Sequence, residues 1–149
     1  MKSFKITKGH NLKLDGQPSD EIIPIEEPSI ISFHPNSFKN IKTKLLVKEG
    51  DAVKIGTPLF YDKKNEKAIF VSTCSGKVKS IVFGDRRVVE SIDIDNNTSD
   101  DQNDISRKIN RENLLKSGLW TCIRQKPYSK IPHFKSSPKS IFISSMPTE

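Results

Sequence analysis

Long apolar runs are missing from this sequence. The longest uninterrupted one covers residues 68–71, whereas a helix needs about 20 predominantly apolar residues to cross a bilayer. The first residues also lack the apolar core of a secretory signal. The sequence therefore predicts a cytoplasmic chain that does not itself cross a membrane.

Cysteine is scarce. Cys74 and Cys122 are the two cysteines of the chain, and they stand 48 positions apart with no second ligand near either of them. Zinc ribbons and disulfide frameworks need closely spaced or numerous cysteines, so the sequence indicates neither of these classes. We expect two reduced thiols, with a bond between the two as the alternative.

Catalytic motifs are absent as well. His10, His34 and His133 are scattered without a carboxylate or cysteine at ligand spacing, and no serine stands in a Gly-x-Ser-x-Gly setting. The glycine-rich signatures that hold nucleotide phosphates are also missing. The sequence predicts no catalytic residue, no bound cofactor and no metal site in this chain.

Acidic residues are rare in one part of the chain. The net charge is +7, yet residues 1–106 contain 16 basic and 16 acidic residues. The excess lies between residues 107 and 139, where nine basic residues stand against the single acid Glu112: Arg107, Lys108, Arg111, Lys116, Arg124, Lys126, Lys130, Lys135 and Lys139. This asymmetry predicts an acidic partner, which is nucleic acid, anionic lipid or another protein.

Short segments rich in β-branched and aromatic residues predict a β domain over residues 29–95. The expected strands cover residues 44–48, 58–61, 68–72, 77–83 and 87–94. Glycine and aspartate stand between them, where a chain must turn. We expect residues 1–28 to pack on this domain.

Residues 96–104 carry no apolar side chain and predict a polar linker. A helix is expected next, capped by Asp104, carrying apolar residues over 105–115 and ending at Ser117 and Gly118. A further strand is expected at 141–144. Residues 105–149 thus predict the start of an α/β domain that the chain leaves incomplete.

Several segments, in order, resemble the NqrA subunit of the Na⁺-translocating NADH:quinone reductase. The opening residues 8–18 look like that family's start, from which His10 and Asn11 depart. The more specific matches are residues 47–54 (VKEGDAVK), 59–65 (LFYDKKN), 75–78 (SGKV), 84–88 (GDRRV), 117–121 (SGLWT), 124–132 (RQKPYSKIP) and 140–143 (SIFI). The resemblance covers nearly the whole chain.

The resemblance implies a mainly β fold with some α structure: a biotinyl/lipoyl-like sandwich-barrel hybrid domain followed by the start of a Rossmann-like α/β domain. It also implies a peripheral, cofactor-free subunit on the cytoplasmic side of the bacterial inner membrane. Such a subunit supports assembly and electron transfer from NADH to ubiquinone, coupled to sodium export. The flavins and the iron–sulfur centre belong to other subunits, of which a membrane-embedded one is the expected partner.

One cluster combines two aromatic residues with a cation, the residue types enriched in protein interfaces. It consists of Trp120, Arg124, Pro127 and Tyr128. We predict that it contacts a partner or a quinone pocket. The alternative is that Trp120 merely covers the end of the helix and Arg124 is solvated.

A hybrid fold raises the question of a lipoyl or biotinyl lysine at a hairpin tip. Lys64 and Lys67 are the candidates. Lys64 stands between Lys63 and Asn65, and Lys67 stands between Glu66 and Ala68. Neither setting matches the lipoyl or the biotinyl motif. We therefore expect unmodified lysines.

A calcium loop is a further possibility for Asp93, Asp95, Asn97 and Asp104, which fall in an EF-hand register. Thr98 occupies the position that needs glycine, and a strand precedes the loop in place of a helix. We expect no metal there.

Two other functional classes remain as alternatives. The first is a basic nucleic-acid-binding module, although no recognised fold signature supports it and no nucleic acid is expected. The second is a lipoyl-like carrier domain or a subunit of the related Rnf electron-transport complex.

Overall fold

The computed structural model describes residues 15–16, 19–104, 106 and 108–143. The chain divides into two units, of which residues 26–137 form one and residues 1–25 with 138–149 form the other. All assigned helices and strands belong to the unit of residues 26–137. Within that unit the elements follow the order β1 (Ile30–Phe33), η1 (Pro35–Ser37), β2 (Thr43–Leu45), β3 (Ala52–Val53), β4 (Pro58–Asp62), β5 (Asn65–Val71), β6 (Gly76–Phe83), η2 (Asp85–Arg87), β7 (Val89–Asn96), α1 (Arg111–Lys116) and η3 (Leu119–Cys122).

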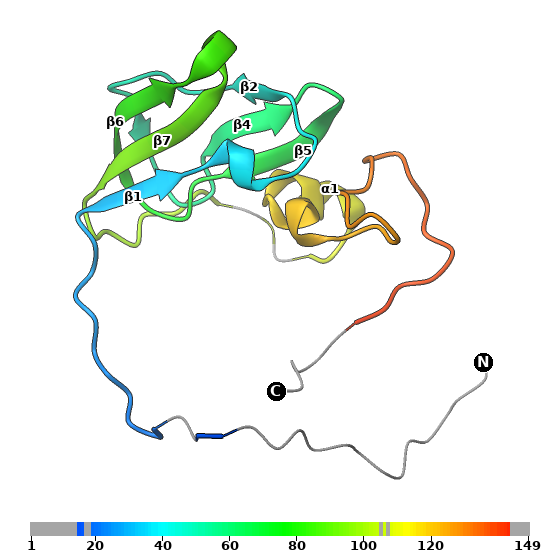
Figure 1. Ribbon diagram of the computed structural model, residues 1–149, viewed down its shortest axis with the longest axis horizontal. Coiled ribbons are helices and arrows are strands. Elements are labelled where there is room, and N and C mark those ends of the chain that lie inside the picture. The colour runs from blue at the N-terminus through cyan, green and yellow to red at the C-terminus, as the bar shows by residue number, and fades with distance from the viewer. Residues whose placement is uncertain (1–14, 17–18, 105, 107, 144–149) are drawn as a thin grey trace. The chain divides into compact units, whose positions relative to one another are not determined.

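The strands form two antiparallel sheets (Figure 1). One sheet has the order β1-β7-β6-β3 and the other has the order β2-β4-β5. In β7 the side chains alternate between the core and the outer face of the sheet: Ile92 and Ile94 are fully buried, while Asp93 and Asp95 face outward. This period of two is the pattern of a sheet with one face in a core.

Both sheets contribute to a single apolar core. The rings of Phe60 and Phe70 stack with their centroids 4.4 Å apart, and Phe38 packs on Phe70 at 4.5 Å. These rings belong to the same cluster as Ile92 and Ile94 of the other sheet. Burying one such side chain fully contributes about 1.5–3 kcal/mol, so this shared core is what joins the sheets.

The five strands expected within residues 44–94 are confirmed, with ends that differ by no more than three residues. Sequence patterns missed β1 and β3. Both are short, and both exist because a longer neighbour pairs with them: Ile30–Phe33 pairs with β7 and Ala52–Val53 pairs with β6. The expected strand at 141–144 is wrong over the described residues 141–143, which pair with no strand and expose their side chains; residue 144 lies outside the described residues.

The start of the predicted helix is also wrong. Ser106 and residues 108–110 are not helical, and α1 begins at Arg111. Asn110, not Asp104, caps it, since the Asn110 carboxamide oxygen accepts a hydrogen bond from the backbone N–H of Asn113 at 2.8 Å. The end at Ser117 and Gly118 is confirmed, and Gly118 has the left-handed φ of +77° that is typical of a helix end.

Residues 101–103, within the predicted polar linker, run along the β domain through backbone hydrogen bonds. The Ile55 N–H donates to the Asp101 carbonyl at 3.0 Å, and the Asn103 N–H donates to the Ile55 carbonyl at 2.9 Å. The hydroxyl of Ser75 also donates to the Asp101 carbonyl. This part of the segment is therefore held against the domain although it has no apolar side chain to bury.

Glycine is required at residue 76, where β6 begins beside the end of β7. Gly76 has φ of +156°, and a Cβ built there would lie 1.9 Å from the backbone oxygen of Asp95. We expect Gly76→Ala to lower the free energy of unfolding by about 3 kcal/mol, at the upper end of the range for strained positions. Urea unfolding measures this loss.

Gly50→Ala is the matched control. Gly50 also has a positive φ, of +88°, but its nearest contact for an added Cβ is the Lys77 side chain at 3.9 Å. We expect a loss of about 1 kcal/mol from the backbone conformation alone. Equal losses in the two variants would contradict the backbone clash at Gly76.

Candidate functional site

Trp120 lies inside the unit of residues 26–137 and not on its surface. It is 7% exposed and packs with Ala68 of β5 and Leu115 of α1. Its indole N–H donates a hydrogen bond to the carbonyl of Pro132 at 2.8 Å. The side chain predicted to meet a partner thus joins η3, α1 and β5.

Asn65 holds the same segment from the β-domain side. This side chain, 6% exposed, donates from Nδ2 to the Pro132 carbonyl at 3.0 Å and accepts from the Phe134 N–H at 3.0 Å. No sequence pattern identifies Asn65, because its partners stand 67 and 69 positions away and leave no local signal. Pro132 therefore accepts two hydrogen bonds from two different elements.

Arg111 completes this attachment. Its guanidinium lies 5.6 Å from the centre of the Trp120 ring, within the range of a cation–π contact. It also donates to the carbonyls of Phe134 and Ser136, at 3.1 Å and 3.0 Å. One of the nine basic residues of the C-terminal part is thus engaged within the fold.

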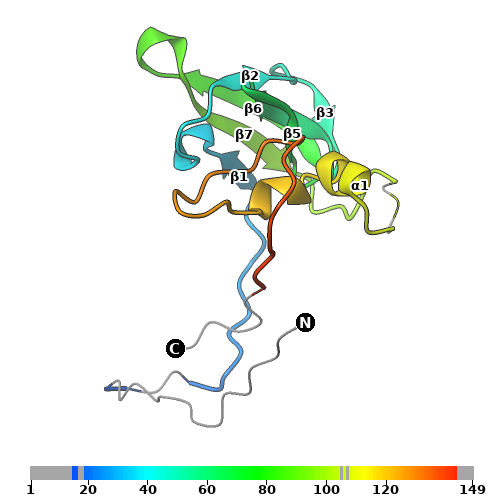
Figure 2. The same ribbon diagram turned by 90° about the vertical axis from the view of Figure 1, so that its right-hand side faces the viewer.

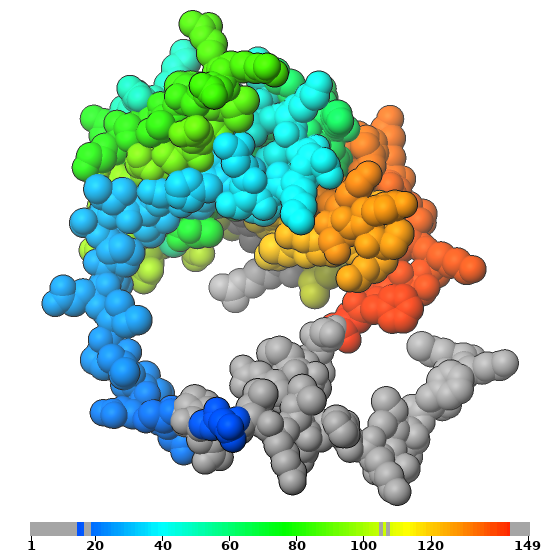
Figure 3. All heavy atoms as spheres, viewed as in Figure 1, coloured from blue at the N-terminus to red at the C-terminus, as the bar shows by residue number. Residues whose placement is uncertain are grey.

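Gly118 allows the α1–η3 turn to approach β5 closely. A Cβ at this position would lie 2.8 Å from a methyl group of Val71 and 3.3 Å from the backbone oxygen of Ile69. Figures 2 and 3 show α1 and the following segment, yellow to orange, lying against the β domain. A larger residue would separate the two surfaces.

The other three predicted site residues are exposed. Tyr128 is 77% exposed, and the Lys130 ammonium lies 5.4 Å from the centre of its ring. Arg124 donates from Nη1 to the carbonyls of Thr121 and Ile123, and Pro127 lies on the surface. The structure divides the four residues into one buried anchor and three exposed side chains. Their contact with a partner or a quinone stays a prediction.

A cleft of about 890 Å³ opens between the β domain and η3. Its aromatic lining comes from Phe33, Phe38, Phe60 and Phe70. Two hydroxyl groups of its wall are engaged with backbone carbonyls, since Ser72 donates to Cys74 and Thr121 donates to Gly118, each at 2.7 Å. The cleft can accommodate an apolar group, and the protons of these two hydroxyls are held by backbone carbonyls.

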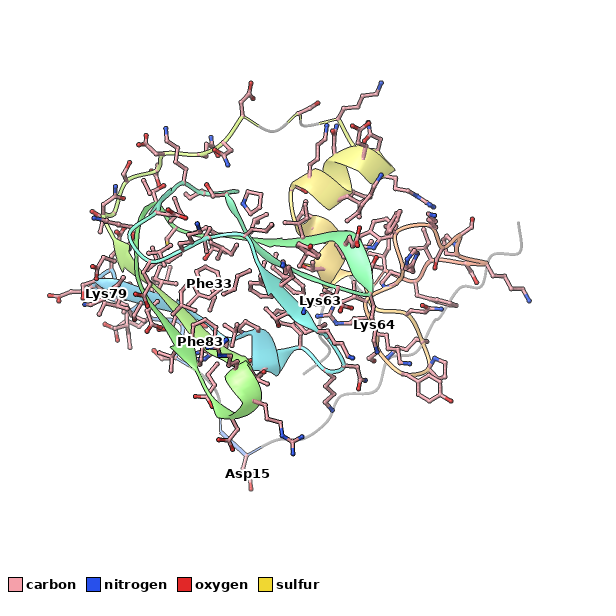
Figure 4. The ribbon with its side chains drawn as sticks, turned by 90° about the horizontal axis from the view of Figure 1, so that it is seen from above. Asp15, Phe33, Lys63, Lys64, Lys79 and Phe83 are labelled. Carbon is pink, nitrogen blue, oxygen red and sulfur yellow. The ribbon has the colours of Figure 1, made fainter. Side chains whose placement is uncertain are left out.

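The two candidate carrier lysines occupy different positions. Lys64 lies in the turn between β4 and β5, beside Lys63, as Figure 4 shows. Lys67 lies within β5, and its ammonium stands 5.3 Å from the centre of the Phe134 ring. Lys64 alone of the two has the hairpin position that a swinging arm requires.

The side chains of the possible calcium loop have separate partners. Asp93 accepts a hydrogen bond from the Ser80 hydroxyl at 2.9 Å, and Asp95 forms an ion pair with Lys79 at 3.2 Å. Asn97 accepts from the Ser99 N–H at 3.1 Å. Nowhere in residues 15–16, 19–104, 106 and 108–143 do three or more His, Cys, Asp or Glu side chains form a group that could hold a metal ion.

Hydrogen bonds set the acidity of Asp93. Bonding from Ser32, the largest contribution, holds the pKa of this carboxyl below its ordinary value, and Ser80 and Ser91 act in the same direction against a partial burial penalty. The ionised carboxylate therefore stabilises the folded state above the unfolded pKa, and this contribution is lost as pH falls through the lower, folded pKa.

We expect Asp93→Asn to reduce the loss of stability in acid. Below about pH 4, near the ordinary pKa of aspartate, the natural chain should lose more free energy of unfolding than the variant does. Urea unfolding over a series of acidic pH values measures the difference. Ser80→Ala should give an intermediate slope, and parallel acid profiles for the natural chain and Asp93→Asn would contradict the assignment.

Trp120→Ala should release residues 108–137 from the β domain. The lost packing costs about 3–5 kcal/mol for a buried aromatic side chain, and the Pro132 carbonyl loses one of its two donors. We expect faster tryptic cleavage after Lys116 and Arg124, together with a lower midpoint of thermal unfolding.

Tyr128→Ala is the matched control for Trp120→Ala. It also truncates an aromatic side chain, but an exposed one, and should change stability by no more than about 0.5 kcal/mol. A similar gain in cleavage rate in both variants would show that Trp120 does not anchor the segment.

No helix in the part of the chain that the structure describes is long and apolar enough to cross a membrane. Two family models match the sequence. The NqrA N-terminal barrel-sandwich hybrid domain matches residues 4–97, and the NqrA second alpha/beta domain matches residues 105–149. Together with the two sheets, these matches confirm the predicted fold class, a hybrid β domain followed by an α/β domain.

The chain is also similar to curated proteins that are named as the A subunits of Na⁺-translocating NADH-quinone reductases. Those of Neisseria meningitidis serogroup C and Klebsiella pneumoniae strain 342 are each 37% identical over 97% of this chain. The protein of Pseudomonas aeruginosa strain UCBPP-PA14 is 35% identical over 98% of it. The chain spans 35% of the length of each of these relatives. On the match of the first family model to 4–97, the chain belongs to the NqrA family, the A subunits of Na⁺-translocating NADH-quinone reductases.

Proposed function

We propose that this chain acts as a peripheral, cofactor-free part of a Na⁺-pumping NADH:quinone oxidoreductase. In that role it supports assembly of the complex and electron transfer from NADH to ubiquinone coupled to sodium export. The observation that carries the proposal is the family match over residues 4–97, extended by relatives that cover 97% of the chain. The proposed location is the cytoplasmic side of the bacterial inner membrane.

In this proposal the flavins, the iron–sulfur centre and the sites for NADH, ubiquinone and Na⁺ belong to other subunits. Asn65 and Asp93 use their polar groups in hydrogen bonds within the fold, which supports this division. The contribution of this chain is then a rigid shape that neighbouring subunits recognise.

The β6–β7 hairpin offers a surface suited to such a neighbour. Arg86 and Arg87 follow each other in the left-handed region, with φ of 55° and 58°. Such a conformation costs of order 1 kcal/mol or more at each non-glycine residue and is concentrated at functional sites. The side chains of Phe83 and Val88 beside them are half exposed, and Figure 1 shows the turn projecting beyond the sheet.

Aromatic and arginine side chains are the residues that most often dominate the binding energy of protein interfaces. The hairpin combines both types on a projecting turn. We place the contact with a membrane-embedded subunit there, with acidic side chains on the partner facing Arg86 and Arg87.

Isolation of the tagged chain from its native membranes, with mass spectrometry of the proteins that accompany it, tests the proposal. We expect the membrane subunits and the flavin-bearing NADH-oxidising subunit to be recovered with it. Phe83→Ser should reduce their recovery, whereas Tyr61→Ser, on the other sheet, serves as the control for a changed aromatic side chain. Recovery of nucleic acid or ribosomal proteins in their place would contradict the proposal and favour the basic nucleic-acid module.

A further inference from the structure

Residues 124–130, here named the basic loop, form an exposed turn that leaves η3 and returns to the body of the domain. An antiparallel bridge closes it, since the Gln125 N–H donates to the Lys130 carbonyl at 2.7 Å. Arg124, Lys126 and Lys130 are exposed along it, and Tyr128 projects from it. Three cations and one aromatic ring therefore lie on a single closed turn.

The positive charge of the basic loop is not balanced by acidic residues nearby in the sequence, nor by ion pairs. Residues 113–148 contain six basic residues and no acidic one. Among residues 15–16, 19–104, 106 and 108–143, the ion pairs are Lys79 with Asp95 and Lys116 with Glu112. Neither involves the basic loop, so its positive field reaches the solvent.

The loop is presented on a fixed base. The chain enters it after Trp120 and leaves it before Pro132, and these two residues are joined by the indole hydrogen bond of 2.8 Å. Asn65 holds the same Pro132 carbonyl from β5. The loop therefore loses little conformational entropy when it binds, which favours association.

The chemistry of the loop fits the surface of an anionic bilayer. A tyrosine has an apolar ring and a polar hydroxyl and is enriched where membranes meet water. Lysine supplies a mobile point charge that can follow mobile headgroups, and each basic residue near an anionic bilayer strengthens binding. The Lys130 ammonium, 5.4 Å from the Tyr128 ring centre, keeps a cation beside the ring.

Nucleic acid fits this surface less well, because single strands bind by stacking bases on exposed aromatic rings. Trp120 is buried, and the ammonium groups of Lys67 and Lys135 lie 5.3 Å and 5.6 Å from the centre of the Phe134 ring. Tyr128 is left as the freely exposed ring of the loop, which is too little for a stacking platform.

We propose that the basic loop binds anionic phospholipid headgroups, with Lys126 and Lys130 providing the electrostatic attraction and Tyr128 entering the interface. This goes beyond the proposed function, since it gives the chain a lipid contact of its own in addition to its contacts with other subunits.

Co-sedimentation of the full chain with vesicles tests the proposal. Vesicles of phosphatidylcholine mixed with phosphatidylglycerol should bind the chain at low salt, and vesicles of phosphatidylcholine alone should not. Lys126→Gln combined with Lys130→Gln should lower the affinity about 25-fold, or about fivefold for each charge, and weaken its dependence on salt. Tyr128→Ser should lower the affinity while leaving the salt dependence unchanged, because the tyrosine carries no charge.

Lys48→Gln combined with Lys54→Gln is the matched control, because it removes the same charge from two exposed lysines on either side of β3. This control should bind the anionic vesicles as the natural chain does, and thermal unfolding of each variant verifies that it is folded. An equal loss of affinity in both double variants would overturn the proposal by showing that net charge alone drives binding. Tighter binding to a single-stranded oligonucleotide than to the vesicles would overturn it in favour of nucleic acid.

The vesicles contain no other protein of the complex, so this assay measures lipid binding by the loop independently of its assembly with other subunits. Failure of vesicle binding with normal recovery of the other subunits would overturn the lipid contact alone. Vesicle binding without any recovered subunit would leave the lipid contact supported and contradict the proposed function.

Discussion

The carbonyl oxygen of Pro132 accepts one hydrogen bond from the Trp120 indole and another from the Asn65 amide. A carbonyl has two lone pairs, so both are used at this point. A donor left without its partner in a buried position costs about 1–3 kcal/mol. Removing this carbonyl contact would therefore leave a donor of η3 and a donor of β5 without a partner, which lowers the stability of both attachments. The attachment of residues 108–137 to the β domain, and hence the position of the basic loop, depends on it.

The positive charge of the chain is concentrated in the segment that this hydrogen-bonded carbonyl attaches to the β domain. Residues 1–106 carry equal numbers of basic and acidic residues, whereas the segment attached to the β domain is basic. Arg111 uses its charge inside the fold, on the Trp120 ring and two carbonyls, but Lys126 and Lys130 remain exposed. A single unit thus carries the two proposed surfaces, an arginine and phenylalanine hairpin for protein and a lysine and tyrosine loop for lipid.

Local patterns were reliable where they repeat along a strand. The strands at 58–61 and 77–83 were predicted because β-branched and aromatic residues stand between turn residues, and they appear as β4 and β6. Local sequence patterns did not predict elements whose structure depends on pairing or capping by other residues. β1 is an edge strand made by pairing with β7, and the helix begins at Arg111 because the extended Asn110 caps it, in place of the predicted Asp104.

The sequence by itself determined the family, since ordered motifs such as residues 47–54 are local, and it determined where the positive charge accumulates. The sequence by itself could not tell which of the four predicted site residues are buried and which are exposed. Only the tertiary structure decided that Trp120 is a buried anchor while Tyr128 is exposed, because burial depends on β5 side chains such as Ala68 that lie far away in sequence. Asn65 was missed for the same reason: a contact across 67 positions has no signature in a local window.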